Sequence, residues 1–272
     1  MTWILGSGVM FGYGALISDV RVSWGSGQTL DALQKIYPVA PNMLAGFSGS
    51  VELGFKLIAD MQQSFVLPKG RLWPPRVAAW HWRRRARRHF AHSSAELRVL
   101  DSQIILAGVS AFKDGPFFRS QCITMRAPDY WPVWIKPREW ASIGSGNTHE
   151  TAKYFANLTA DAEWPYLQSE IVKPGETASS VATTVIIDLM KMPMASVSGV
   201  IQVGLARIDR CELKPLMRYK QVGAWSIQEP DNRALITSWQ GLQKVAEKIG
   251  LSASTAQATQ ATGHRVARIR CY

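Results

Sequence analysis

The fold of this chain is set by its first residues, MTWILGSGVMFGYGALISDVRVSWGSGQTLDALQKI (residues 1–36). No charged side chain occurs from Met1 to Ser18, and the first carboxylate, Asp19, ends the apolar run. The pattern predicts two strands, residues 2–10 and 13–24, with a turn at Gly12 between them. Because the second strand is apolar at consecutive positions, we expect it to be buried on both faces up to Asp19.

The composition is that of a globular chain with a localised excess of positive charge. Its 272 residues, 47% of them hydrophobic, are enough for one large core or two small ones. The formal net charge is +11, and the positive residues are concentrated between Lys69 and Arg98. The cysteines at 122, 211 and 271 show no paired spacing, which argues against a disulfide scaffold or a zinc ribbon.

The first 18 residues have neither the basic region of a signal peptide nor the unbroken apolar length of a membrane helix, because glycines interrupt them. We therefore expect a cytoplasmic protein without a membrane segment.

Beyond residue 36 the hydrophobic pattern alternates between strands and helices, and residues 30–37 read as a short helix-like segment. We expect strands at residues 43–50, 102–109, 117–125, 131–136 and 199–205, and helices at 51–65, from Pro75, around 152–159 and at 179–190. This order favours helix layers on both sides of a two-sheet core. After residue 215 the pattern changes to an amphipathic helix at 234–250, a Ser/Thr/Ala/Gln-rich segment at 252–263 and a basic tail. We expect a domain at 1–215 and a C-terminal extension at 216–272.

The positive charge lies on the helix that begins at Pro75, where proline suits the first turn. Val77 and Trp80 are expected to form its packed face, with the run Arg83–Arg88 on the rest of its surface. Such a run usually forms a solvated face or an interface with an acidic partner. The interleaved tryptophans could stack on bases, but no nucleic-acid-binding module surrounds them, which disfavours nucleic-acid binding.

Several separated segments form one constellation. They are Thr2, Asp19-Val20-Arg21, Lys35, the turn at residues 44–50 and the Gly-Ser-Gly turn at 144–146. In this order and spacing they resemble the proteasome β-subunit family of N-terminal-nucleophile hydrolases. Among bacterial members the bacterial proteasome homologue and the HslV-type protease are most similar. The resemblance covers about residues 2–205 and implies an α/β (α+β) fold, a four-layer αββα sandwich.

The resemblance also implies a role for each matching residue. Thr2, freed by removal of Met1, matches the nucleophile, and its α-amine matches the general base. Lys35 matches the lysine whose charge lowers the pKa of that amine, and Asp19 matches the carboxylate that orients the lysine. Ser145 matches the serine that hydrogen-bonds the amine, and the N–H of Gly49 matches the oxyanion donor.

Simpler interpretations of these residues remain open. Lys35 could be an exposed helix lysine, Asp19 could cap a strand, and Ser145 could be the N-cap of the helix that follows. The sequence also departs from the family, because the pair Ser198-Gly199 is preceded by Ala195 where members commonly carry an aspartate. HslV-type enzymes depart from the pattern at this position too, so the departure does not exclude catalysis.

The positions that set specificity in the family are apolar here: Val22, Leu33, Phe47 and Val51. They predict a substrate-binding pocket that prefers hydrophobic residues on the acyl side of the cut.

The resemblance implies a threonine-type endopeptidase that acts on peptides or unfolded proteins without a metal or an organic cofactor. It implies a closed, stacked ring of identical subunits, six- or sevenfold, and a ring ATPase as a possible partner. Two alternatives remain open: an amidohydrolase that acts on small amides, and a proteasome-like assembly of little activity that serves as a scaffold or binding chamber.

Overall fold

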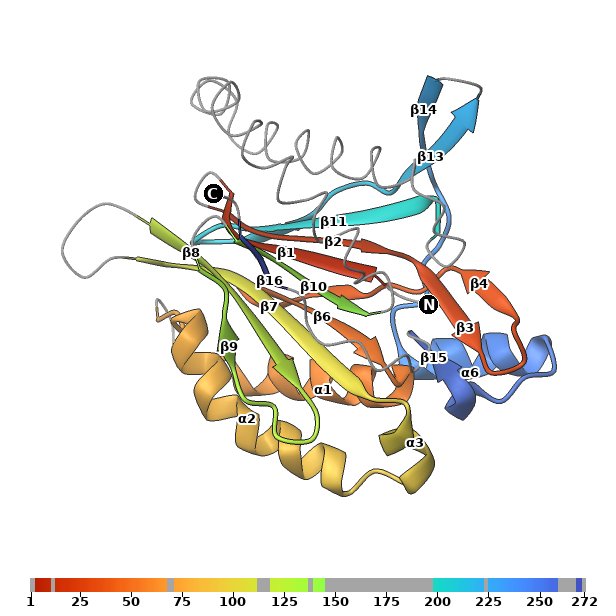
Figure 1. The fold of residues 1–272 in the computed structure, drawn as a ribbon, viewed down its shortest axis with the longest axis horizontal. Helices are drawn as coiled ribbons and strands as arrows, with labels where there is room; N and C mark the ends of the chain where they lie inside the picture. Colours follow the sequence, from red (N-terminus) through yellow and green to blue (C-terminus); the bar gives the residue numbers. More distant parts are fainter. Residues whose placement is uncertain are drawn as a thin grey trace.

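Strands dominate the chain, as the computed structural model shows for residues 3–10, 13–67, 71–111, 118–136, 139–144, 198–222, 225–258 and 268–270. One large sheet has eight antiparallel strands in the order β14-β13-β11-β2-β1-β10-β16, with β12 paired to β11 (Figure 1). Their bounds are β1 Trp3–Met10, β2 Tyr13–Asp19, β10 Glu139–Gly144, β11 Val200–Ala206, β12 Cys211–Leu213, β13 Met217–Val222, β14 Trp225–Pro230 and β16 Arg268–Arg270.

The second large sheet has five antiparallel strands in sequence order, β5-β6-β7-β8-β9. They are β5 Ile36–Ala40, β6 Met43–Gly49, β7 Ser102–Ala111, β8 Phe118–Arg126 and β9 Val133–Trp134. A third, small sheet has the order β15-β3-β4, formed by β15 Ala256–Gln257, β3 Arg21–Trp24 and β4 Thr29–Asp31.

The five-stranded sheet is buried on both faces because its side chains alternate between two cores. On β7, Ile104 and Leu106 join the core on the helix side, whereas Ile105 and Ala107 join the core between the two sheets. The sheets approach closely at Gly14, where an added Cβ would lie 2.5 Å from the backbone nitrogen of Gly108. A continuous apolar run is therefore the pattern of a strand between two layers.

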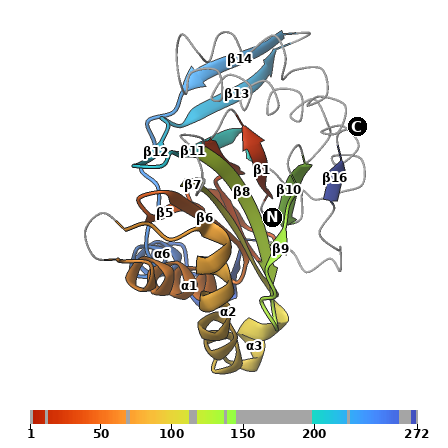
Figure 2. The same ribbon diagram turned by 90° about the vertical axis from the view of Figure 1, so that its left-hand side faces the viewer.

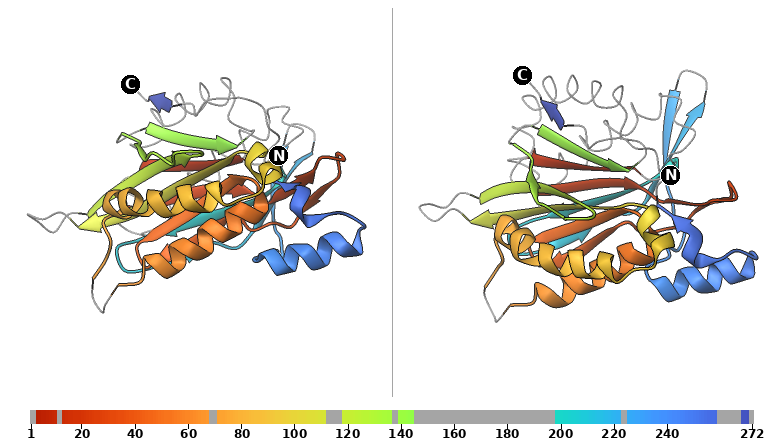
Figure 3. Two further views of the ribbon diagram at one scale, coloured as in Figure 1. Left: turned by 90° about the horizontal axis from the view of Figure 1, so that it is seen from below. Right: turned by 60° about the horizontal axis from the view of Figure 1, so that its bottom comes forward.

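The helices cover the outer face of the five-stranded sheet (Figure 2). They are α1 Val51–Ser64, α2 Pro75–Ala91, the short α3 Ala95–Val99 and α6 Trp239–Lys248. Side chains of α1, α2 and α6 all join the same core cluster on this face, and α6 lies beside α1 (Figure 3). Among the helices in the described part of the chain, none is both long and apolar enough to cross a membrane.

The prediction of a four-layer αββα sandwich is wrong. The described residues form mostly antiparallel strands, and the described helices α1, α2 and α6 all pack into one core cluster, on the outer face of the five-stranded sheet. β13, β14 and β16 extend the eight-stranded sheet, so the C-terminal segment contributes strands to it. The helices expected around 152–159 and at 179–190 lie outside the described residues.

Most expected strands and helices are confirmed, with local differences. Residues 30–37 are not helix-like: β4 ends at Asp31, and β5 begins at Ile36, whose N–H donates to the Gln202 side chain instead of a helical carbonyl. The strand expected at 13–24 divides at Val20, because Asp19 accepts a hydrogen bond from Arg21 N and β3 enters the small sheet. Gly144 of the expected Gly-Ser-Gly turn is the last residue of β10, and Ser145 and Gly146 lie outside the described residues.

The C-terminal amphipathic helix is confirmed but shorter than residues 234–250. It begins after Ser238, whose side chain caps it by accepting from Gly241 N. Ahead of it, Ile236 pairs with Leu33, which holds the segment against the β4–β5 connection. The expected domain boundary after residue 215 stays a prediction.

The packed face of α2 differs from the expected one. Val77 and Trp80 are exposed, and the buried side chains are the alanines at 78, 79 and 86 together with Pro75 and Trp82. Trp82 is held by its indole N–H, which donates to Asp60 of α1 at 2.7 Å. The alanines face the core because small side chains let helix and sheet approach closely.

Asp60 joins α1 to α2 and gives stability a pH dependence. Burial raises the pKa of this carboxyl, but hydrogen bonds from Arg85, His89 and Trp82 lower it to about 2 from its usual 3.8. Because the folded pKa is the lower one, its stabilisation is complete above about pH 4 and is lost as the pH falls toward 2.

We expect Asp60→Asn to lower the free energy of unfolding at pH 7 by about 1.5–3 kcal/mol, since it weakens hydrogen bonds to a charged group. Urea denaturation at pH 7, 4 and 2 measures the difference, which should shrink between pH 4 and 2. The exposed Asp129, 3.8 Å from Arg87, is the control: Asp129→Asn should change stability by less than about 0.5 kcal/mol. An equal effect of both substitutions would contradict the assignment.

Candidate active site

A fully buried ion pair lies at the start of β1. Lys35 Nζ is 2.7 Å from Asp19 Oδ1, and both side chains are 0% exposed. The same carboxylate oxygen accepts from the backbone N–H of Trp3 at 2.9 Å. Thr2 lies outside the described residues. The ion pair therefore contacts the backbone nitrogen of Trp3, the residue that follows Thr2 in the chain.

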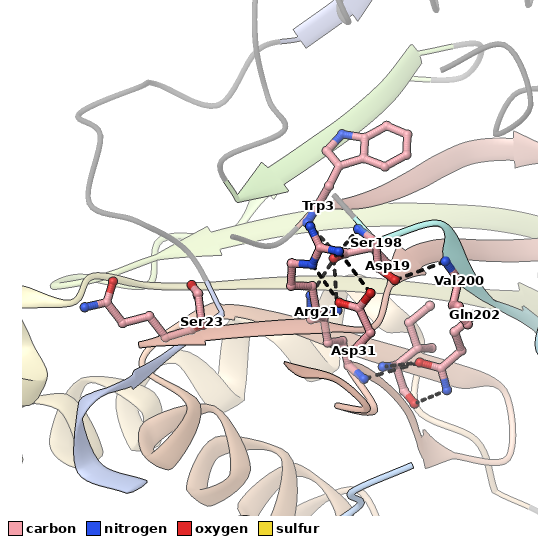
Figure 4. Close-up of polar contacts among 11 residues, drawn as sticks. Trp3, Asp19, Arg21, Ser23, Asp31, Ser198, Val200 and Gln202 are labelled. Carbon is pink, nitrogen blue, oxygen red and sulfur yellow. Dashed lines mark hydrogen bonds and ion pairs between the residues drawn. The ribbon is translucent and has the colours of Figure 1, made fainter. Parts of the chain in front are cut away.

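Asp19 is saturated with hydrogen-bond donors, as Figure 4 shows. Its second oxygen, Oδ2, accepts from Arg21 N at 3.1 Å and from Ser198 N at 3.4 Å. Donors from the starts of β1 and β3, the loop before β11 and the β4–β5 connection therefore converge on one buried carboxylate. Such a group holds its neighbours in fixed positions.

Lys35 is held from its backbone as well as from its ammonium group. Gln202 of β11 accepts from Lys35 N at 3.3 Å and from Ile36 N at 3.1 Å. Burial lowers the pKa of the Lys35 ammonium, and the attraction of Asp19 offsets this only in part, so the pKa lies below its usual value of 10.5. The interpretation of Lys35 as an exposed helix lysine is therefore wrong.

A second carboxylate lies beside the first. Asp31 of β4 accepts two hydrogen bonds from the Arg21 guanidinium, at 2.6 and 2.9 Å. Burial raises the pKa of Asp31, but hydrogen bonds from Arg21 and the Ser198 side chain bring it below its usual value. Asp31 thus supplies a carboxylate to the side chain of Ser198.

Gly49 is the last residue of β6, two residues before the N-terminus of α1. Its φ of +98° belongs to the region that glycine favours, and an added Cβ would lie 2.5 Å from Asp101 O. In the β5–β6 pair, Ile36, the residue after Lys35, lies opposite Gly46. Gly49 is three residues farther along β6. Ser145 lies outside the described residues; it follows Gly144, the Cα partner of Trp3.

The four residues predicted to bind substrate lie together but do not reach the surface. Val22, Leu33, Phe47 and Val51 are each 0% exposed and belong to one core cluster. The segment that shares this cluster from the C-terminal side includes Ala256 and Ala258, which are 1% and 0% exposed. The role of the four residues in binding stays a prediction.

The arginine run of α2 has partners within the chain. Arg83 stacks on Trp80 and Trp131, with its guanidinium carbon 4.6 and 4.1 Å from the ring centroids. Arg85 pairs with Asp60 at 2.6 Å. These contacts explain part of the run without a binding partner, and its contact with an acidic partner stays a prediction.

Sequence reasoning identified Asp19 and Lys35 and missed the residues around them. The sequence places Arg21 in the Asp19-Val20-Arg21 motif without a role of its own, and it predicts no site role for Asp31, Ser198 or Gln202. One signal was available for Gln202, because a lone amide in the apolar strand 200–205 must find partners when buried.

Within the described residues no group of three or more His, Cys, Asp or Glu side chains could hold a metal ion. The described site contains two cations, Lys35 and Arg21, paired with two carboxylates, and one of these carboxylates accepts from the peptide nitrogen of Trp3. In comparisons with known proteins, the chain matches no family model and no curated sequence.

Proposed function

We propose that the chain hydrolyses amide bonds with Thr2 as an N-terminal nucleophile, which cleavage between Met1 and Thr2 exposes. The observation that carries the proposal is the fully buried Lys35–Asp19 pair at the nitrogen of Trp3. Burying an ion pair costs desolvation free energy that packed apolar side chains would not. A buried lysine with a lowered pKa beside the residue bonded to Thr2 is typical of a functional site.

The proposed reaction begins when the Thr2 hydroxyl attacks the scissile carbonyl carbon and gives its proton to the free α-amine. The oxygen of the tetrahedral intermediate accepts from the N–H of Gly49. The intermediate then expels the amine product, which takes the proton from the α-ammonium, and leaves an ester on Thr2. Water, deprotonated by the α-amine, hydrolyses this ester and restores the hydroxyl.

Lys35 and Asp19 have separate roles in this scheme. The positive charge of Lys35 disfavours a second positive charge nearby, so it lowers the pKa of the α-amine and keeps more of it in the basic form. Asp19 orients Lys35 and accepts from Trp3 N, which fixes the chain where Thr2 is attached. Arg21 and Asp31 hold Ser198 and the start of β3 as positioning residues.

Peptides and unfolded proteins are the proposed substrates, with hydrophobic residues on the acyl side of the cut. The stacked ring and a ring ATPase partner follow from the resemblance and stay predictions, as does the cytoplasmic location, which follows from the first 18 residues. A hydrolase of small amides is the second candidate. The observation that favours it is the complete burial of Val22, Leu33, Phe47 and Val51, which leaves their side chains no exposed surface.

A substrate panel tests the proposed function. The wild-type chain, freed of Met1, should cleave fluorogenic peptides with apolar residues before the cut, and Thr2→Ala should abolish this cleavage. Turnover of small acylated amines without peptide cleavage would select the second candidate. Hydrolysis that survives Thr2→Ala would contradict the assigned nucleophile in both cases.

A further inference from the structure

The small sheet contains a strand from the far end of the chain. β15 pairs antiparallel with β3, joining Ala256 to Trp24 and Gln257 to Ser23. Gln257 also forms an antiparallel bridge with Ser50, and Ala258 N donates to Gly49 O at 2.7 Å. The segment therefore lies between β3 and the Gly49–Ser50 turn and pairs with both.

The side chains of this segment alternate as those of a strand do. Ala256 and Ala258 are buried in the cluster that contains the four predicted substrate-binding residues, whereas Gln257 between them is half-buried. Two further contacts anchor the backbone: Trp24 Nε1 donates to Ser252 O at 3.2 Å, and Ser23 Oγ donates to Gln257 O at 3.4 Å. The backbone of residues 252–258 thus supplies most of the polar contacts of the segment, and the methyl groups of Ala256 and Ala258 pack into the apolar cluster.

An extended peptide that adds to a sheet edge binds in this manner. Its main chain pairs with the edge strand, and pockets accept its alternate side chains. β3 pairs in this way with residues 256–257, and the next residue, Ala258, donates to Gly49, the residue predicted to bind the oxyanion.

We infer that residues 252–258 are an internal peptide ligand, which occupies the strand position of the substrate and must leave before a substrate binds. The inference rests on the proposed function. It defines the substrate class more closely: extended peptides that pair with β3 and place alternate side chains, as Ala256 and Ala258 do, against Val22 and Phe47 in the same cluster.

The internal strand is suited to displacement. Within β15 and the residue after it, the segment buries only the two methyl groups of Ala256 and Ala258, which remove little apolar surface from water. A substrate with larger apolar side chains gains more from the same site. Because the segment is tethered, it competes at an effective concentration on the order of millimolar, so we expect it to raise the apparent KM of a peptide substrate.

A reversible cross-link tests the inference. Ser23 and Gln257 are direct partners in an antiparallel pair, in which Cα atoms lie about 4.5–5.5 Å apart, within the range of a disulfide. The variant Ser23→Cys with Gln257→Cys is prepared in a background where Cys211 and Cys271 are serine. We expect oxidation to lower peptide hydrolysis at least tenfold and a reductant to restore it.

The matched control is Lys220→Cys with Ile227→Cys, partners in the β13–β14 pair away from β3. Oxidation of the control should leave hydrolysis unchanged. A second variant, Ala258→Glu, places a charge in the buried position and should lower the KM for peptides at least threefold by releasing the segment. A synthetic peptide of sequence SASTAQA, residues 252–258, should inhibit this variant competitively.

The outcomes separate the inference from the proposed function. Equal peptide hydrolysis by the oxidised and reduced cysteine pair overturns the internal ligand and leaves the hydrolase standing. Absence of hydrolysis from the reduced pair, the control and the wild-type chain alike contradicts the proposed function and, with it, the inference. A fall on oxidation of the pair alone supports both.

Discussion

Lys35→Met is expected to lower amide hydrolysis by at least about 100-fold, because it removes the charge that lowers the pKa of the α-amine. It should also lower the free energy of unfolding by about 3–5 kcal/mol, since it leaves the Asp19 carboxylate buried without its cation. Rates with a fluorogenic peptide and urea denaturation measure the two effects.

Lys56→Met is the matched control for this prediction. Lys56 forms an ion pair with Glu52 on the surface of α1, where its side chain is 51% exposed. Its loss should cost less than about 0.5 kcal/mol and leave hydrolysis unchanged. Comparable losses at both lysines would show that Lys35 has no special role.

Asp19→Asn gives the second large effect. The substitution keeps an oxygen that can accept from Trp3 N but leaves the Lys35 ammonium buried without a carboxylate. We expect a loss of stability of about 3–5 kcal/mol and a fall in hydrolysis, because Lys35 then has neither its orientation nor its charge partner. Urea denaturation and steady-state kinetics measure both.

The double variant Asp19→Asn with Lys35→Met tests whether the stability contributions of the two buried charges are coupled. Because both buried charges are gone, it should be more stable than either single variant, although its hydrolysis stays low. Asp31→Asn, whose side chain is 27% exposed, is the control and should cost less. Additive losses in the double variant would contradict a coupled buried pair.

The sequence predicted elements whose pattern is local. The apolar run 13–18 predicted β2, and the hydrophobic pattern of residues 51–65 predicted α1. Local pattern failed where a distant partner decides the conformation. Residues 30–37 have a helix-like composition, but Val20 O accepts from Leu33 N and Gln202 accepts from Ile36 N, so the segment is extended.

Distant partners also explain why the packed face of α2 and the extent of the eight-stranded sheet differ from the predictions. The packed face of α2 is decided by Asp60, a partner on another helix, and not by the larger apolar residues Val77 and Trp80. The extension of the eight-stranded sheet by residues beyond 215 depends on pairing with β11 and β10, which no periodicity within that segment reveals.

The candidate site was predictable in part. The resemblance predicts Asp19 and Lys35 as site residues from their spacing. In the structure Lys35 Nζ lies 2.7 Å from Asp19 Oδ1. The contact of Asp31 with Ser198, and that of Ala258 with Gly49, join positions more than 150 residues apart in the sequence. The segment 252–263 is low in complexity, so composition alone gave no reason to place it against the site.

The central claim is that Thr2, with Lys35 and Asp19 beside its attachment, is the nucleophile of a hydrolase. Intact-mass analysis after incubation with a threonine-directed electrophile tests it most directly. We expect a chain that has lost Met1 and carries one adduct, which peptide mapping locates on Thr2 and whose formation Lys35→Met slows. A chain that retains Met1 and forms no adduct on Thr2 would contradict it.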